Sequence, residues 1–143
     1  TMLQWSIGAN LTGEDVELIS ERVFEHGRSL AVDGHATPLA CLVRSDGAVV
    51  AGASGRTEYG RLFVQSLWVH ESLRGQGVGT DLLRRMEQAA LEDGCESAII
   101  ETLDERACSL YRRVGYEVIA HIPRYVGPFN RYILLKRLAA SAA

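Results

Sequence analysis

The feature that most limits the fold of this chain is a glycine-rich turn between an apolar run and an amphipathic segment. The turn reads Arg74-Gly75-Gln76-Gly77-Val78-Gly79 and follows LFVQSLWV at 62–69. The apolar residues after the turn recur at helical spacing, which predicts a helix that starts at Val78 and stops at Gly94. Charged residues are expected on its outer side: Arg84, Arg85, Glu87, Glu92 and Asp93. A strand, a tight turn and a helix therefore follow one another directly.

The first half of the chain predicts a helix and then a run of antiparallel strands. Apolar residues at mostly helical spacing indicate a helix over 14–32, with a break near Gly27. Two short apolar runs within 38–56 are joined by Asp46-Gly47, a strong hairpin signal. The run at 62–69 would be the third strand of this meander.

The second half continues with a short buried strand at 97–101 and a short helix at 105–115. The last two strands are predicted at 116–122 and 131–138, joined by a loop that contains Pro123 and Pro128. This order predicts an α/β (α+β) fold with one mixed central sheet of about six to seven strands flanked by helices. We expect a single domain over 1–143, with its core at about 3–138 and a tail at 139–143.

Composition and charge exclude several classes of function. The chain has 143 residues and a net charge of −3 without a dense basic block, so nucleic acid is not an expected partner. No apolar run approaches the roughly 18 to 20 residues of a membrane span, so no membrane association and a cytoplasmic location are expected. The three cysteines are far apart, and the histidines at 26, 35 and 121 lack metal-ligand spacing. No metal site is predicted.

The glycine turn predicts a phosphate site. A helix begins with unpaired N–H groups and a partial positive charge, and glycines remove the β-carbons that would keep an anion away. A plain tight turn is the alternative. A P-loop is excluded because no lysine stands at the helix start. A Rossmann dinucleotide site is a remote alternative, since the spacing is GxGxG rather than GxGxxG.

Two sequence blocks resemble the GCN5-related N-acetyltransferase (GNAT) superfamily. Arg74-Gly75-Gln76-Gly77-Val78-Gly79 is similar to its Arg/Gln-x-x-Gly-x-Gly/Ala signature. Farther along, Ala107-Cys108-Ser109-Leu110-Tyr111 through Gly115-Tyr116 is similar to its Ala-x-x-Leu-Tyr-x-x-x-Gly-Phe/Tyr element. The resemblance covers residues 62 to about 120 and implies a GNAT-like domain that uses acetyl-CoA.

The resemblance also implies where acetyl-CoA lies. Its pyrophosphate would lie on the glycine turn, and its pantetheine arm would pair with the strand that ends near Val69. Asp104 stands where many family members have asparagine, which leaves that contact open. The implied cofactor-binding residues are Leu67, Trp68, Val69, Arg74, Gly75, Gln76, Gly77, Val78, Gly79, Thr80, Asp104 and Tyr111.

Acetyl transfer from a thioester to an amine needs a base for the amine and a proton for the departing thiolate. The resemblance implies Tyr111 as the general acid; a core tyrosine is the structural alternative. Glu101, at the end of a strand, is the candidate general base, with Glu71 and His70 as rivals. A covalent route through Cys108 is weaker because no histidine partner is evident.

The sequence therefore predicts an N-acetyltransferase that moves an acetyl group from acetyl-CoA to a primary amine by direct attack. The acceptor would be a small molecule or a peptide, and a homodimer is a further expectation. The first helix and the loop from Pro123 to Asn130 are expected to line the acceptor pocket, with Trp68, Tyr125 and Phe129 as candidate walls. A non-catalytic acyl-CoA-binding sensor or interaction module and a Rossmann-type oxidoreductase remain as alternatives.

Overall fold

The computed structural model describes residues 2–30 and 34–139. Internal contacts divide the chain into two units, residues 1–34 and residues 35–143, and each is described by itself. Residues 140–143 of the predicted tail and positions 31 and 32 of the predicted first helix lie outside the described residues. The single domain expected over 1–143 remains a prediction.

The first unit contains one helix, α1, over Glu14–Leu30. The predicted break near Gly27 is wrong, because the helix continues through this position. A glycine costs a helix about 1 kcal/mol relative to alanine, which lowers its stability without interrupting it. Acidic residues in the first turn and Arg28 in the last complement the helix dipole.

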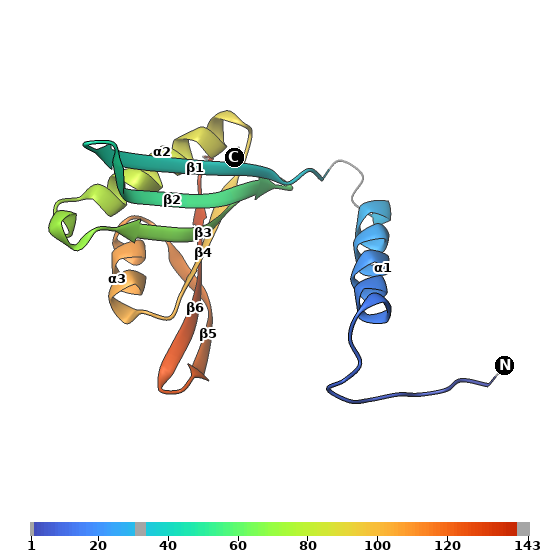
Figure 1. Ribbon diagram of the computed structural model, residues 1–143. Coiled ribbons are helices and arrows are strands. Elements are labelled where there is room, and N and C mark those ends of the chain that lie inside the picture. Colours follow the sequence, from blue (N-terminus) through green and yellow to red (C-terminus); the bar gives the residue numbers. More distant parts are fainter. Residues whose placement is uncertain (1, 31–33, 140–143) are drawn as a thin grey trace. The chain divides into compact units, whose positions relative to one another are not determined.

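The second unit is a six-stranded mixed sheet with two α-helices (Figure 1). The strand order is β1-β2-β3-β4-β6-β5, in which β3 and β4 form the parallel pair and all other neighbours are antiparallel. This confirms the mixed sheet predicted from the sequence. The elements are β1 Thr37–Ser45, β2 Ala48–Glu58, β3 Arg61–Val69, the 3₁₀ turn η1 Glu71–Leu73, α2 Val78–Glu92, β4 Ser97–Thr102, α3 Glu105–Arg113, β5 Glu117–Val126 and β6 Phe129–Arg137.

The predicted Asp-Gly hairpin is confirmed. Asp46 and Gly47 join β1 to β2 with φ values of 50° and 83°. Two successive residues with positive φ form the turn whose twist matches that of the flanking strands, and Asp-Gly is favoured there. Tyr59 and Gly60 repeat the pattern between β2 and β3, so the first three strands form the predicted meander.

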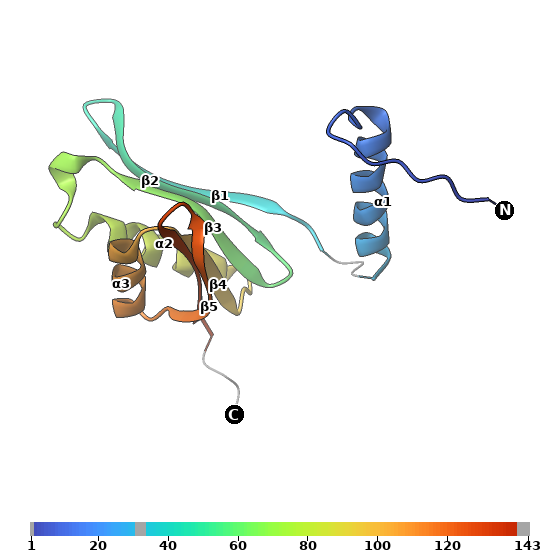
Figure 2. The same ribbon diagram turned by 90° about the horizontal axis from the view of Figure 1, so that it is seen from below.

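One hydrophobic core lies between the sheet and the two helices. Helix α2 contacts β1, β2 and β3, whereas α3 contacts β4, β5 and β6 (Figure 2). Alternate strand residues such as Leu62, Val64, Ala98 and Ile100 are buried, as expected for strands with one covered face. Helix α2 contributes Leu82, Leu83, Met86 and Ala90 to the same cluster.

Two sequence predictions about these elements are wrong. Residues 123–130 do not form a loop, because β5 runs to Val126 and turns tightly at Gly127 and Pro128 into β6. Proline is tolerated within β5 because β5 is an edge strand and the pairing is irregular between Ile122 and Val126. Glu87, expected on the outer side of α2, is only 9% exposed.

Candidate active site

The sheet opens between β3 and β4. These strands pair only from Arg61 with Ser97 to Val64 with Ile100, and then part. Just there the β2–β3 register shifts between Ser54 and Gly55, which leaves Gln65 as the extra residue of a bulge. A β-carbon on Gly55 would overlap the Phe63 carbonyl oxygen, so only glycine fits opposite the bulge.

A cleft of about 1210 Å³ lies at this opening. Ligand pockets of small-molecule enzymes usually measure about 300–1,000 Å³, so this cleft has room for two reactants. It is lined by residues 64–67 of β3, residues 100–106 from the end of β4 into α3, Tyr111, Tyr125 and residues 128–131. The cleft brings together four of the predicted catalytic and cofactor-binding residues: Leu67, Glu101, Asp104 and Tyr111. It also contains two of the three candidate wall residues, Tyr125 and Phe129.

Tyr111 presents its phenol to the cleft from α3. Tyr111 is only 6% exposed, yet it lines the cleft. Its hydroxyl takes part in no side-chain hydrogen bond within the described residues, and no fully enclosed polar side-chain atom there lacks a partner, so this hydroxyl is not fully enclosed. Burial and the nearby Asp104 carboxylate raise the pKa of Tyr111 above its ordinary value. The phenol is therefore protonated at neutral pH and has a free hydrogen to donate.

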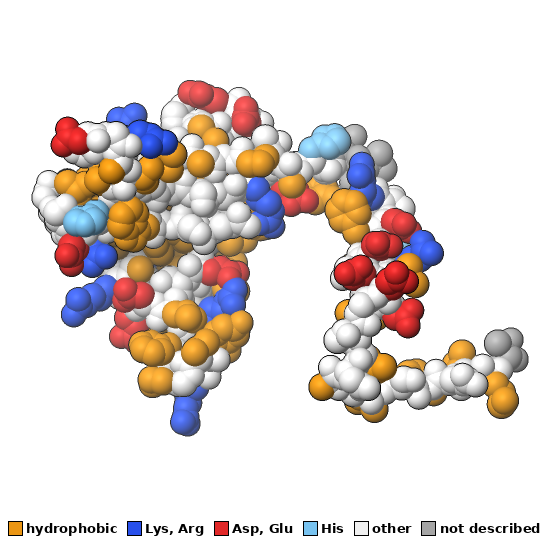
Figure 3. Space-filling model, in the orientation of Figure 1, with side chains coloured by type: hydrophobic (Ala, Val, Ile, Leu, Met, Phe, Trp, Pro, Cys, Tyr) orange, Lys and Arg blue, Asp and Glu red, His pale blue; other side chains and the backbone are white. Residues whose placement is uncertain are grey.

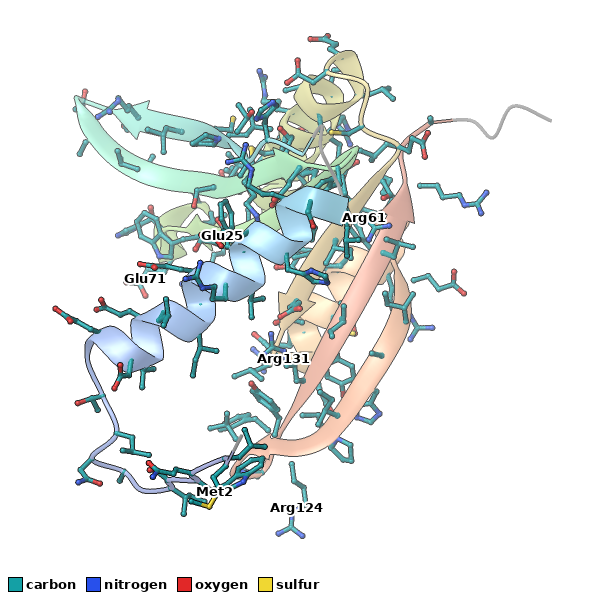
Figure 4. The ribbon with its side chains drawn as sticks, turned by 90° about the vertical axis from the view of Figure 1, so that its right-hand side faces the viewer. Met2, Glu25, Arg61, Glu71, Arg124 and Arg131 are labelled. Atoms are coloured by element: carbon teal, nitrogen blue, oxygen red, sulfur yellow. The ribbon has the colours of Figure 1, made fainter. Side chains whose placement is uncertain are left out.

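Glu101 lies near the end of β4, on the same cleft, and is held by an arginine that the sequence did not reveal. This residue is Arg131 of β6, which is labelled in Figure 4. Arg131 forms an ion pair with Glu101 and donates a second hydrogen bond to the Tyr125 hydroxyl at 2.8 Å. The alternation of polar and apolar residues in the last predicted strand, 131–138, does not mark Arg131 as a site residue. Its role follows from the antiparallel pairing of β4 and β6, which aligns Glu101 with Ile133.

The glycine turn, residues 74–80, joins η1 to α2. Gly75 and Gly77 have φ values of 76° and 81°, a conformation that glycine adopts without strain. The main-chain N–H groups of residues 75–80 have no hydrogen-bond partner among the described residues, and the first bond of α2 runs from Asp81 N–H to the Gly77 carbonyl at 3.0 Å. No side chain caps this helix.

Side chains hold the glycine turn from outside. The Arg74 Nε donates to the Val69 carbonyl at 3.1 Å, and the Gln76 amide donates to the Ser72 carbonyl at 3.1 Å. A β-carbon on Gly79 would meet Val69 at an ordinary 3.7 Å. The turn therefore combines a fixed backbone with unpaired amides, which is the arrangement that a phosphate requires. Neither this turn nor Trp68 and Val69 are among the residues that line the cleft.

Asp104 and His70 have structural partners, and the other two rival catalytic residues are set apart by burial or by position. His70 caps η1, because its Nδ1 accepts the Ser72 N–H at 3.1 Å. Asp104 caps α3 by accepting the Arg106 N–H at 2.8 Å. Burial raises the pKa of the Cys108 thiol, which keeps it protonated and unreactive. Glu71 is exposed and belongs to η1 rather than to the lining of the cleft.

Glu87 of α2 belongs to a buried polar cluster with Tyr116, which precedes β5, and Lys136 of β6. It accepts hydrogen bonds from the Tyr116 hydroxyl at 2.9 Å and from Lys136 Nζ at 2.6 Å. Burial and the Glu87 carboxylate raise the pKa of Tyr116 far above its ordinary value. Helical spacing from Leu83 and Ala90 was the available signal for the inward position of Glu87.

Metal and membrane features are not found in the described ranges 2–30 and 34–139. No group of three or more His, Cys, Asp or Glu side chains is arranged to hold a metal ion there. No helix within the same ranges is both long and apolar enough to cross a membrane.

Comparisons with known proteins give one consistent result. The model of the acetyltransferase (GNAT) family matches residues 8–116. Blasticidin-S acetyltransferase of Streptomyces morookaense is 38% identical over 93 residues, which cover 64% of this chain and 68% of that protein.

Solved structures share the fold at lower identity. An acetyltransferase from Bacillus cereus superposes with a TM-score of 0.84 at 24% identity, covering 92% of this chain and 97% of that one. An aminoglycoside 6′-N-acetyltransferase complexed with coenzyme A gives a TM-score of 0.66 at 16% identity, covering 74% and 76%. On the strength of the family match, this chain belongs to the acetyltransferase (GNAT) family and is an acetyl-CoA-dependent N-acetyltransferase.

Proposed function

We propose that this chain acetylates a primary amine of a small molecule by direct attack on the thioester of acetyl-CoA in the cleft between β3 and β4. The observation that carries the proposal is the free Tyr111 phenol at the wall of this opening. The amine acceptor is supported by relatives that act on blasticidin S and on aminoglycosides.

The donor would be held by main-chain groups. The unpaired amides of residues 75–80 suit the diphosphate. Beyond Val64, β3 pairs with β2 on one side and leaves its other edge without a strand among the described residues. That free edge suits the pantetheine arm, whose amides would pair with it as an added strand does.

Transfer forms a bond between the amine nitrogen and the carbonyl carbon and breaks the bond between that carbon and sulfur. Glu101 takes a proton from the amine, directly or through water, and Tyr111 gives one to the departing sulfur. A phenol is a weaker acid than a thiol, with ordinary pKa values of about 10 and 8.5. The Tyr111 hydrogen bond therefore stabilises the thiolate before the proton moves, and solvent returns the proton to Tyr111.

The state of Cys108 supports direct attack over a covalent cysteine route. Its thiol is buried, its pKa is raised, and no histidine is bonded to it among the described residues. A nucleophilic cysteine needs the opposite environment, with a lowered pKa and an adjacent base.

A cytoplasmic location and a homodimer are further parts of the proposal. Cys41, Cys95 and Cys108 are all free, which suits a reducing compartment. Light scattering on the purified chain would test the dimer, and cell fractionation would test the location.

The test of the proposed function is Tyr111→Phe, with Tyr59→Phe as a control on an exposed tyrosine in the β2–β3 turn. Thiol release with an amine library should fall about 100-fold in kcat for the first variant, the usual size of a general-acid effect. Calorimetry should show acetyl-CoA affinity within twofold of the wild type for both variants.

Unchanged turnover in Tyr111→Phe would remove Tyr111 from the mechanism. Absence of acetyl-CoA binding to the wild type would contradict the proposal as a whole. Binding without thiol release for any amine would favour the non-catalytic coenzyme A-binding module instead.

A further inference from the structure

The side of the cleft away from the donor has a distinct chemical character. We call the residues Glu101, Leu103, Tyr125, Phe129 and Arg131 the acceptor wall; all of them line the cleft. They come from the end of β4 and from the β5–β6 hairpin, and this inference about them rests on the proposed function.

The arginine of the acceptor wall is already occupied. Arg131 donates through Nη1 to the Tyr125 hydroxyl at 2.8 Å and through Nη2 to one oxygen of Glu101. Its Cζ also lies 4.8 Å from the centre of the Tyr125 ring. By contrast, the second oxygen of Glu101 has no partner among the described residues. The wall therefore offers a free hydrogen-bond acceptor beside a guanidinium that is already paired.

The charged side chains of the cleft lining sum to a net negative charge. Its lining holds three carboxylates, on Glu101, Asp104 and Glu105, against two guanidiniums, on Arg106 and Arg131. Glu105 uses one oxygen to accept the Tyr132 hydroxyl at 3.2 Å. Because the lining is net negative, it favours a cation and disfavours a carboxylate.

Aromatic rings cover the rest of the acceptor wall. Tyr125 is 48% exposed and Phe129 is 58% exposed, although both lie beside the cleft. Hydrophobic side chains gather over the β5–β6 hairpin in the space-filling view (Figure 3). Exposed aromatic rings next to carboxylates form surfaces that attract organic cations through both apolar contact and the cation–π interaction.

We propose that the acceptor is a cationic amine carried on a planar or apolar body and lacking a carboxylate next to the amine. Its ammonium group binds the free oxygen of Glu101, and its body lies on Tyr125 and Phe129. Most alkyl amines are protonated at neutral pH, as lysine is with its pKa of about 10.4. Glu101 thus binds the ammonium and takes one proton from it, which passes to solvent before the neutral amine attacks. A second proton leaves the nitrogen to solvent as the amide forms.

Three probe amines test this specificity in a thiol-release assay with acetyl-CoA. 2-Phenylethylamine has the ring and the amine, n-propylamine lacks the ring, and phenylalanine adds a carboxylate. We expect kcat/KM for 2-phenylethylamine to exceed that for each of the other two by about tenfold or more.

Two variants assign the preference to the acceptor wall. Phe129→Ala should lower kcat/KM for 2-phenylethylamine about tenfold, mainly through KM, and leave n-propylamine nearly unchanged. Tyr59→Ala, which removes an equally exposed ring outside the cleft, is the matched control. Glu101→Gln should lower the ratio of kcat/KM for 2-phenylethylamine to that for phenylalanine, because it removes a negative charge that disfavours the carboxylate of phenylalanine. A purely catalytic loss would lower kcat/KM for both amines alike and leave this ratio unchanged.

The outcomes separate this inference from the proposed function. Equal kcat/KM for the three probes, or a preference for phenylalanine, would overturn the acceptor inference and leave acetyl transfer intact. Thiol release with other amines but not with 2-phenylethylamine would overturn it too. No release with any amine would contradict the proposed function itself.

Discussion

In the proposed function, the glycine turn binds the donor and the acceptor wall binds the amine, and the two regions do so by opposite means. The turn presents main-chain N–H groups of residues 75–80, and its side chains only hold the backbone in place. The acceptor wall instead presents side chains, which come from the end of β4 and from the β5–β6 hairpin. Main-chain N–H groups suit the phosphates of the donor, whereas side chains set the chemistry that recognises the acceptor.

The largest effect on this comparison is expected from Gly77→Val. A branched side chain cannot adopt the φ of 81° at this position without strain, and it would cover the neighbouring amides. We expect the Kd for acetyl-CoA to rise about 100-fold, which is about 2.7 kcal/mol. Calorimetry on the purified variant measures this change.

Gly47→Val is the matched control for Gly77→Val. Gly47 has a φ of 83° and open space at its β-carbon, but it lies in the β1–β2 turn. The two variants should lose similar stability, and only Gly77→Val should lose donor affinity. Equal affinity for acetyl-CoA in both would show that the glycine turn does not bind the donor.

Lys136→Met tests how the two regions are joined. Lys136 of β6 and Glu87 of α2 link the hairpin to the helix that begins at the glycine turn. Removal of Lys136 leaves the largely buried Glu87 carboxylate with only the Tyr116 hydroxyl as a partner among the described residues. We therefore expect the free energy of unfolding to fall by about 2 kcal/mol. Urea unfolding measures the loss, and an unchanged midpoint would show that the cluster contributes nothing.

Alkaline pH should weaken the same cluster. The pKa of Tyr116 is raised in the folded state, so the unfolded chain releases this proton first as pH rises. The stabilisation is complete below the ordinary tyrosine pKa of about 10 and is lost above it, by at most about 1.4 kcal/mol per pH unit. The urea concentration at the unfolding midpoint should fall less steeply between about pH 9 and pH 11 in Tyr116→Phe than in the wild type. Parallel curves would be evidence that Tyr116 does not cause this loss of stability. The range from pH 9 to pH 11 extends about one pH unit on either side of the ordinary tyrosine pKa.

The smallest effect is expected from Gly79→Ala. Gly79 is helical and its β-carbon would make only an ordinary contact with Val69 at 3.7 Å. Alanine should raise helix stability by up to about 1 kcal/mol and change the Kd for acetyl-CoA less than about threefold. A large loss of affinity would mean that a ligand atom lies against this position, which would extend the donor site into α2.

Local patterns predicted most of the fold. The Asp46-Gly47 hairpin, the strand before the glycine turn and the helix after it follow from residues adjacent in sequence. Tyr111, implied by the second sequence block, and Glu101, chosen for its place at the end of a strand, both line the cleft, and their catalytic roles stay predictions. Features of this kind depend on residues that are close together in the chain, so a single sequence is enough to predict them.

Features that depend on distant partners were not predictable. Helical spacing from Leu83 and Ala90 signalled the inward position of Glu87, but its partners Tyr116 and Lys136 stand 29 and 49 residues away and could not be predicted. The pairing of Arg131 with Glu101 needs the β4–β6 register. The hairpin of β5 and β6 replaces a predicted loop because the irregular pairing between Ile122 and Val126 accommodates Pro123. No local pattern encodes these registers.

The most direct test of the central claim follows the backbone amide protons of residues 75–80 by NMR while coenzyme A is added. The account predicts downfield shifts at these amides, as expected for new hydrogen bonds to phosphate, and small changes at the amides of the β1–β2 turn. Binding of coenzyme A with the signals of residues 75–80 unmoved would contradict the account.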